Sequence, residues 1–150
     1  MDDPWIACIR LDGTRATLGL RDALVQADAL WDLSGEPRIV DAATHRLLLA
    51  VLHRVFGPLD VQAWGELWKK RRWDAATIDE YLSAWRHRFD LFDSERPFYQ
   101  VAEPRVKPKS IISLIRHVAS GRNPTLFDHH TEAEGLALSP AEAAFALITA

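Results

Sequence analysis

Residues 5–18 read Trp5-Ile-Ala-Cys-Ile-Arg-Leu-Asp-Gly-Thr-Arg-Ala-Thr-Leu18, and this stretch decides the fold class. Apolar and β-branched residues on both sides of Asp12-Gly13 are typical of two strands that flank a tight turn. Asp-Gly is a strong hairpin signal because both positions of a two-residue turn need positive φ. We therefore expect a β-hairpin made of residues 5–11 and 14–18.

The residues after this hairpin have mainly helical patterns. Apolar residues recur at helical spacing in Leu20, Leu24, Ala27 and Leu30, and Gly35 is placed to end that helix. A second helix over residues 37–56 is apolar on most of its circumference, which predicts the central core helix. Asp60 and Asp74 are expected to cap two further helices, which reach about Arg72 and Phe89.

The last third of the chain has weaker patterns. Residues 97–101 suggest a short strand, and Ser110 is placed to cap a short amphipathic helix that ends at Gly121. Ser139-Pro-Ala-Glu142 has the spacing of a capping box with proline at the first helical position. No helix-ending signal precedes Ala150, so we expect the chain to be a piece of a longer protein. The predicted fold class is α+β, mostly α-helical, with an N-terminal β-hairpin, packed helices and a long loop before a truncated last helix.

Composition indicates one cytoplasmic globular domain. The chain has 150 residues, of which 48% are apolar, and it needs no covalent cross-links at this size. The lone Cys8 permits no intrachain disulfide. The N-terminus lacks a signal-peptide pattern, and the apolar run over residues 47–52 is far too short to span a bilayer. We therefore expect no membrane contact.

Charge is distributed unevenly along a chain whose net charge is only -3. Residues 96–122 carry an excess of five positive charges over the single acid Glu103, whereas residues 123–150 carry four acids and no Lys or Arg. The cations of this first segment are Arg96, Arg105, Lys107, Lys109, Arg116 and Arg122. The asymmetry indicates either a local anionic partner or a solvated charged face.

Residues 120–135 form a long connection that carries Leu126, Phe127 and the pair His129-His130. Loops of this length in a compact domain are usually functional or disordered. Asp128-His129-His130 contains metal-ligand residue types, but consecutive residues rarely bind one ion together, so we expect no metal there.

Other residues of catalytic type are interpreted as structural. Asp41, His45 and His53 have spacings that place them on one side of a helix, which allows a buried catalytic pair. We expect instead that each histidine is satisfied by a neighbouring carboxylate or carbonyl. Cys8 is expected to be a small core residue. Most of the six tryptophans, Trp64 and Trp68 among them, are expected to pack in the core. Residues 69–72, Lys-Lys-Arg-Arg, complement the negative end of a helix dipole. We find no catalytic motif and expect no enzyme.

Three segments together carry a family resemblance. The first is Trp5-Ile-Ala-Cys-Ile-Arg-Leu-Asp-Gly13, followed by Leu18-Gly-Leu-Arg-Asp-Ala-Leu24. The second is Arg88-Phe-Asp-Leu-Phe-Asp-Ser-Glu-Arg-Pro-Phe-Tyr-Gln100. The third is Asn123-Pro-Thr-Leu-Phe-Asp-His129, which leads into Leu138-Ser-Pro-Ala-Glu-Ala143. The chain thereby resembles the N-terminal part of the large subunit of the type I-E CRISPR Cascade surveillance complex, the CasA family.

The resemblance implies a non-catalytic subunit of an RNA-guided antiviral complex. Such a subunit helps to recognise the protospacer-adjacent motif, starts R-loop formation and recruits the helicase-nuclease, while base pairing reads the sequence. The implied partners are other Cascade subunits, the 5′ region of the guide RNA, double-stranded target DNA and the helicase-nuclease. Residues 1–150 are then the N-terminal part of the large globular domain, without its remainder and without the C-terminal helical bundle.

The resemblance also implies a contact loop that docks near the 5′ end of the guide RNA. An aromatic-x-polar tripeptide of this loop falls on Phe127-Asp128-His129, and Asn123 and Leu126 support its shape. The supporting basic residues are Lys107, Lys109, Arg116 and Arg122. Some relatives hold a structural zinc with cysteines, but this chain has only Cys8, so we expect neither zinc nor another cofactor.

Two other interpretations remain open at this point. A small metal-dependent hydrolase would use His129 or His130 with Asp128 or Asp41, and it requires these side chains to converge on an ion. A purely structural helical interaction domain would need none of the basic residues that precede the loop.

Overall fold

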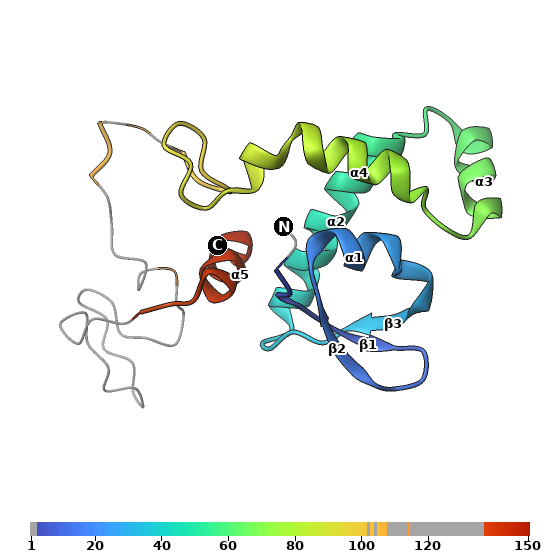
Figure 1. Cartoon of the computed structure of the whole chain (residues 1–150), viewed down its shortest axis with the longest axis horizontal. Coiled ribbons are helices and arrows are strands. Elements are labelled where there is room, and N and C mark those ends of the chain that lie inside the picture. The colour runs from blue at the N-terminus through green and yellow to red at the C-terminus, as the bar shows by residue number, and fades with distance from the viewer. Residues whose placement is uncertain (1–2, 102, 104, 108–113, 115–136) are drawn as a thin grey trace. The chain divides into compact units, whose positions relative to one another are not determined.

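The computed structural model describes residues 3–101, 103, 105–107, 114 and 137–150 (Figure 1). The chain divides into two compact units, Met1–Phe89 and Asp90–Ala150, which are described separately. The first unit contains a small antiparallel sheet and packed helices, which confirms the predicted α+β class. None of the described helices is both long enough and apolar enough to cross a bilayer.

The predicted hairpin is present. Strand β1 (Ile6–Arg10) pairs with β2 (Arg15–Leu18) in antiparallel register, with Ile6 opposite Leu18. The predicted two-residue turn is wrong. Arg10 donates its backbone N–H to the Thr14 oxygen at 2.8 Å, so the turn consists of residues 11–13, and among these only Gly13, at φ 83°, has positive φ. Asp12 instead accepts hydrogen bonds from the backbone N–H of Thr14 at 2.9 Å and from its hydroxyl at 2.6 Å. The aspartate thus closes the turn with its side chain.

The helix predicted to extend past residue 30 is shorter, and a strand follows it. Helix α1 (Leu20–Val25) leads into the 3-10 helix η1 (Ala27–Ala29) and then into β3 (Leu30–Leu33). Strand β3 pairs antiparallel with the second edge of β1, giving the order β2-β1-β3. The helical spacing was misleading because pairing along the free edge of β1 outweighs the local preference. Gly35 therefore follows a strand and does not end a helix.

Helix α2 (Ile39–Phe56) confirms the long helix expected over residues 37–56. In the first unit it extends from beside the sheet to α4 (Figure 1). The helix was expected to be the central core helix, and it contributes to the core with part of its surface. One stripe is buried, formed by Val40, Asp41, Ala43, Thr44, Leu47 and Val51. Leu49 is 53% exposed on another face.

Both aspartate caps are confirmed. Asp60 accepts from the N–H of Ala63 at 2.7 Å at the start of α3 (Val61–Lys70), and Asp74 accepts from that of Thr77 at 2.9 Å before α4 (Ala75–Ala84). Helix α3 ends at Lys70 because Arg71 has left-handed backbone, at φ 54°. A 3-10 helix, η2 (Arg86–Phe89), completes the unit.

The core of the first unit lies between the sheet and three helices. Helix α4 packs on α1 and α2, and α1 also contacts β2. The buried apolar side chains come from both kinds of element and include Ile6, Cys8, Leu18, Leu20, Leu24, Leu33, Leu47, Ile78 and Leu82. Burial of this set is the main favourable term for the unit.

The second unit has one regular helix among its described residues. The predicted strand at residues 97–101 is wrong, because turns occupy this stretch and Tyr99 has left-handed backbone. The capping box is confirmed in α5 (Pro140–Thr149), where Ser139 accepts from the N–H of Glu142 and the Glu142 carboxylate accepts from that of Ser139. The helix predicted between Ser110 and Gly121 lies outside the described residues, apart from Leu114.

A bidentate ion pair joins α1 to α4 and has a testable pH dependence. Arg21 donates to Asp79 from Nε at 2.6 Å and from Nη2 at 2.9 Å. This pairing lowers the pKa of Asp79 from its ordinary value. Since a carboxyl with a lowered folded pKa stabilises above its unfolded pKa of about 3.9, we expect Asp79→Asn to be less stable than the wild type at neutral pH.

The difference in stability between the wild type and Asp79→Asn should shrink as the pH falls below the unfolded pKa of about 3.9. It should vanish once the pH has passed the lower pKa that Asp79 has in the folded state. Denaturant titrations at a series of pH values measure it. A gap that persists unchanged at the acidic end would show that the carboxylate charge is not its cause.

Candidate functional site

The contact loop implied by the family resemblance lies outside the described residues. This applies to Asn123, Leu126, Phe127, Asp128, His129 and His130, and to the basic residues Lys109, Arg116 and Arg122. Their roles therefore stay predictions. Of the residues assigned to this loop and its basic support, the structure describes Lys107 alone, and this side chain is exposed.

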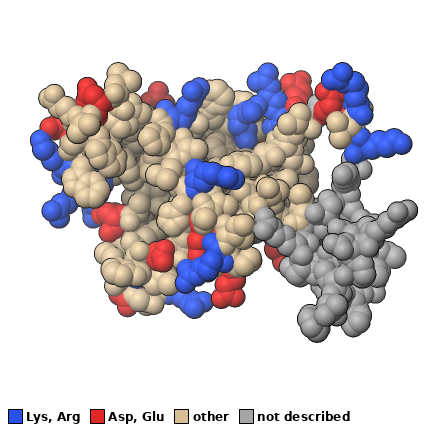
Figure 2. Space-filling model, turned by 180° about the vertical axis from the view of Figure 1, so that it is seen from behind, with Lys and Arg blue, Asp and Glu red and all other residues tan. Residues whose placement is uncertain are grey.

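Two of the basic residues that precede the loop, Arg105 and Lys107, are described by the structure, and one of them is neutralised by an ion pair. Arg105 forms a bidentate pair with Glu103, at 2.8 Å from Nε to Oε1 and 3.0 Å from Nη2 to Oε2. The Arg105 guanidinium lowers the pKa of Glu103, and the carboxylate raises the pKa of Arg105. Lys107 makes no ion pair with another described residue. Positive and negative side chains are interspersed on the face shown in Figure 2, so charge does not form one basic field there.

The polar side chains of α2 are structural. Asp41 accepts from the N–H of Gly35 at 2.5 Å and from Arg38 Nη1 at 3.0 Å. The Nδ1 atom of His45 lies 2.9 Å from the backbone oxygen of Asp41, which confirms that a carbonyl satisfies this histidine. His53 is exposed. No group of three or more metal-ligating side chains converges within the described ranges, which do not include the pair His129-His130.

Cys8 is a core residue, as expected. Its side chain is fully buried on β1, and its Sγ atom lies 3.4 Å from the backbone oxygen of Ala16. Burial raises the pKa of this thiol. A buried thiol with a raised pKa is a poor nucleophile, because the reactive form is the thiolate.

The expectation that most tryptophans pack in the core is wrong. None of the six is fully buried, and Trp31 and Trp68 are 74% and 72% exposed. No residue of α3 is buried, so its two tryptophans lie at the surface of the first unit. The i, i+4 spacing of Trp64 and Trp68 therefore describes an exposed aromatic stripe and not a core-facing one.

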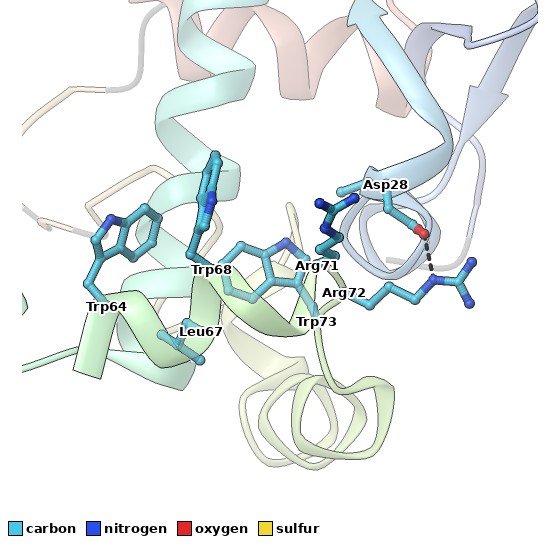
Figure 3. Close-up of a pocket in the computed structure, with 8 residues that line it drawn as sticks. Asp28, Trp64, Leu67, Trp68, Arg71, Arg72 and Trp73 are labelled. Carbon is cyan, nitrogen blue, oxygen red and sulfur yellow. Dashed lines mark hydrogen bonds and ion pairs between the residues drawn. The ribbon is translucent and has the colours of Figure 1, made fainter. Parts of the chain in front are cut away.

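These exposed rings line a pocket, which we call the α3 pocket, with a volume of about 490 Å³. Its walls come from η1, from α3 and from the residues that follow α3. The lining residues are Ala27, Asp28, Trp64, Leu67, Trp68, Arg71, Arg72 and Trp73. In the view of Figure 3 the three indoles follow one another, Arg71 lies beyond Trp73, and the Arg72–Asp28 pair marks the far end.

Two contacts hold the pocket together. Arg72 Nε donates to Asp28 Oδ2 at 2.5 Å, which ties the end of α3 to η1 across 44 residues of sequence. Trp73 stacks on Phe56 at the end of α2, with ring centroids 5.1 Å apart and planes inclined by 24°. Trp64 and Trp68 are tilted by 48° at 6.0 Å. The pocket is thus lined by η1, by α3 and by the residues that follow α3, and Phe56 of α2 supports one of its walls.

The sequence contains a signal for this pocket in addition to the helix-dipole interpretation of its cations. Two tryptophans one turn apart, followed by four consecutive cations, combine stacking groups with positive charge. In the structure, Lys69 pairs with Glu66 at 2.6 Å and Arg72 pairs with Asp28, whereas Arg71 lines the pocket. The four cations therefore have different surroundings, so the interaction with the helix dipole does not describe everything that they contact.

The chain matches known proteins over its whole length. Residues 1–150 match the profile of the family described as CRISPR-associated protein Cse1. The sequence is 39% identical to CRISPR-associated protein CasA/Cse1 of Thermus thermophilus over 153 residues, covering 99% of this chain and 30% of that protein.

Solved structures agree with the sequence match. The Cse1 crystal structure from Acidimicrobium ferrooxidans superposes with a TM-score of 0.77 at 37% identity, over 99% of this chain and 27% of the other. A structure described as a CRISPR RNA-guided surveillance complex has a TM-score of 0.83 at 25% identity, covering 98% and 32%.

The chain therefore spans about a third of the length of these relatives. The order of its motifs, its hairpin-and-helix fold and the match over residues 1–150 agree. The chain belongs to the CRISPR-associated Cse1 (CasA) family.

Proposed function

We propose that this chain acts as the N-terminal part of the large, non-catalytic subunit of an RNA-guided Cascade surveillance complex in the cytoplasm. The observation that carries the proposal is the family match over residues 1–150. The structural match to a surveillance complex described as RNA-guided supports it. In this role the subunit helps to recognise the protospacer-adjacent motif on target DNA, to start R-loop formation and to recruit the helicase-nuclease.

We assign the contact with the complex to residues 121–135, and most directly to Phe127 and His129. A loop phenylalanine can stack on an unpaired base, and a histidine can donate to a phosphate or to a base edge. Lys107 is exposed and has no acidic partner among the described residues, so it can approach an anionic backbone. Asp128 is repelled by phosphate, and we assign it to a protein neighbour or to a base amino group.

The test replaces Phe127 and His129 by alanine in the full-length subunit and measures incorporation into the complex and affinity for target DNA. Loss of one stacked base costs about 1–3 kcal/mol, so target affinity or incorporation should fall by roughly 5- to 150-fold. The matched control is Phe92→Ala with His53→Ala, because both are exposed residues outside the loop.

The control should assemble and bind like the wild type. Equal behaviour of the two double variants in both measurements would remove Phe127 and His129 from the site. It would leave family membership untouched.

A further inference from the structure

We propose that the α3 pocket binds one nucleotide of a single-stranded nucleic acid, with the base against the exposed indoles and a phosphate at Arg71. The proposal concerns a second contact, in the first unit, and it rests on the pocket and not on residues 121–135. Its evidence is the shape of the pocket, the exposure of its rings and the charge of its rim.

The pocket has the size and lining of a small-ligand site. A volume of about 490 Å³ lies within the range of roughly 300–1,000 Å³ that is usual for such sites. Its walls are mainly aromatic and apolar, and its few polar groups are Asp28, Arg71 and Arg72. This combination of broad apolar faces with few charged groups suits a flat ring that carries an anionic substituent.

The aromatic faces are accessible and partly preorganised. Trp68 is 72% exposed, and no residue of α3 is buried beneath other elements. Trp73 is held by its stacking on Phe56, and Arg72 is held by Asp28, so these walls exist before a ligand arrives. Exposed aromatic side chains in a positively charged groove are the usual means of holding single-stranded bases without reading their sequence.

The positive charge of Arg71 at the rim of the pocket favours an anionic ligand. Asp28 is occupied by Arg72, and no carboxylate in the described part of the chain lies within ion-pair distance of Arg71. The hydroxyl and the N–H of Thr77 lower the pKa of Asp74, and Lys70 adds a smaller contribution, so Lys70 has this carboxylate nearby. Arg71 is therefore the pocket cation without an internal partner among the described residues, and its planar guanidinium suits a phosphate.

A nucleotide can contact both the indoles and the Arg71 charge of the pocket, whereas an apolar protein segment can contact only the indoles. Tryptophan and arginine also dominate the binding energy of protein–protein interfaces. An apolar segment over these rings would desolvate Arg71 and leave its charge unpaired, which is costly. A phosphate pairs with that charge while its base covers the indoles, so the observations favour single-stranded nucleic acid.

The test titrates the chain with fluorescein-labelled oligothymidylate and oligouridylate and follows anisotropy between about 50 and 200 mM salt. Trp68→Ala should weaken binding by roughly 5- to 150-fold, the range expected for the loss of one stacking partner. Arg71→Gly should lower the slope of log affinity against log salt by about 0.7, because one phosphate contact is lost on a single strand. Glycine suits the left-handed backbone at residue 71, so this variant keeps the end of α3.

Two matched controls lie away from the pocket. Trp31→Ala removes an equally exposed indole from β3, and Arg15→Ala removes an exposed cation from β2. Both should bind like the wild type. If Trp68→Ala binds no worse than Trp31→Ala, the proposal is wrong. If the pocket variants bind oligonucleotide normally but fail to join a purified complex, the pocket is a protein interface and the proposal is also wrong.

Discussion

Replacing Ile78 by alanine should lower the free energy of unfolding by about 2–5 kcal/mol, the range observed for aliphatic residues truncated to alanine in a packed core. Ile78 has 0% exposure and lies on α4, which packs on both α1 and α2. Truncation leaves a cavity that these three helices cannot all close together. The measurement is denaturant unfolding, with the midpoint and the slope recorded for each variant.

Two variants define the scale for Ile78. Ile78→Val removes one methylene and should cost about 0.5–1.5 kcal/mol. Leu59→Ala removes an exposed aliphatic side chain before α3 and should change the free energy by less than about 0.5 kcal/mol. A cost for Ile78→Ala as small as that of Leu59→Ala would mean that α4 is not part of the cooperative core.

Replacing Asp41 by alanine should cost about 1–3 kcal/mol, because it removes the acceptor of a part-buried backbone donor. The Asp41 side chain is 12% exposed, and its Oδ1 atom accepts from the N–H of Gly35 at 2.5 Å. This bond joins the segment after β3 to the first turn of α2. Asp41→Asn keeps an oxygen acceptor and should retain part of the stability, as measured in the same unfolding experiment.

The other side of this contact provides an independent test. A Cβ atom at Gly35 would lie 2.9 Å from both Asp41 Oδ1 and Val40 Cγ1, so Gly35→Ala must displace the helix start or the bond. We expect the costs of Gly35→Ala and Asp41→Ala to be less than additive, because both disturb one interaction. Glu80→Ala, an exposed acid on α4, is the control. Full additivity would show that the two residues act separately.

Local signals in the sequence predicted the elements that depend on local chemistry. The Asp60 and Asp74 caps and the Ser139 capping box are all present, because each needs only groups within three residues of one another. The hairpin around Asp12-Gly13 is present too, with a turn longer than the two residues predicted. The long helix over residues 39–56 was predictable for the same reason, since its pattern persists over five turns.

Other elements depend on partners that are distant in sequence. Leu30–Leu33 has both helical spacing and strand-compatible residues, and the free edge of β1 decides between them. At Pro97–Val101 no such edge pairs with the chain within the described residues, and turns form instead. Trp68 has the spacing of a core residue, but exposure depends on which helices cover α3, and none of the described ones buries it.

The candidate contact loop and the α3 pocket differ in the same way, since the loop was nominated from local sequence and the pocket depends on distant partners. The loop residues Phe127 and His129 were identified by a motif within one short segment, so sequence alone was sufficient to nominate them. The pocket exists because Asp28 of η1 meets Arg72 after α3 and because Phe56 of α2 stacks on Trp73. The sequence by itself therefore determined the family, the hairpin and the caps, whose interactions are local. Only the tertiary structure decided the third strand and the aromatic pocket, because side chains far apart in the chain must first be packed together to form them.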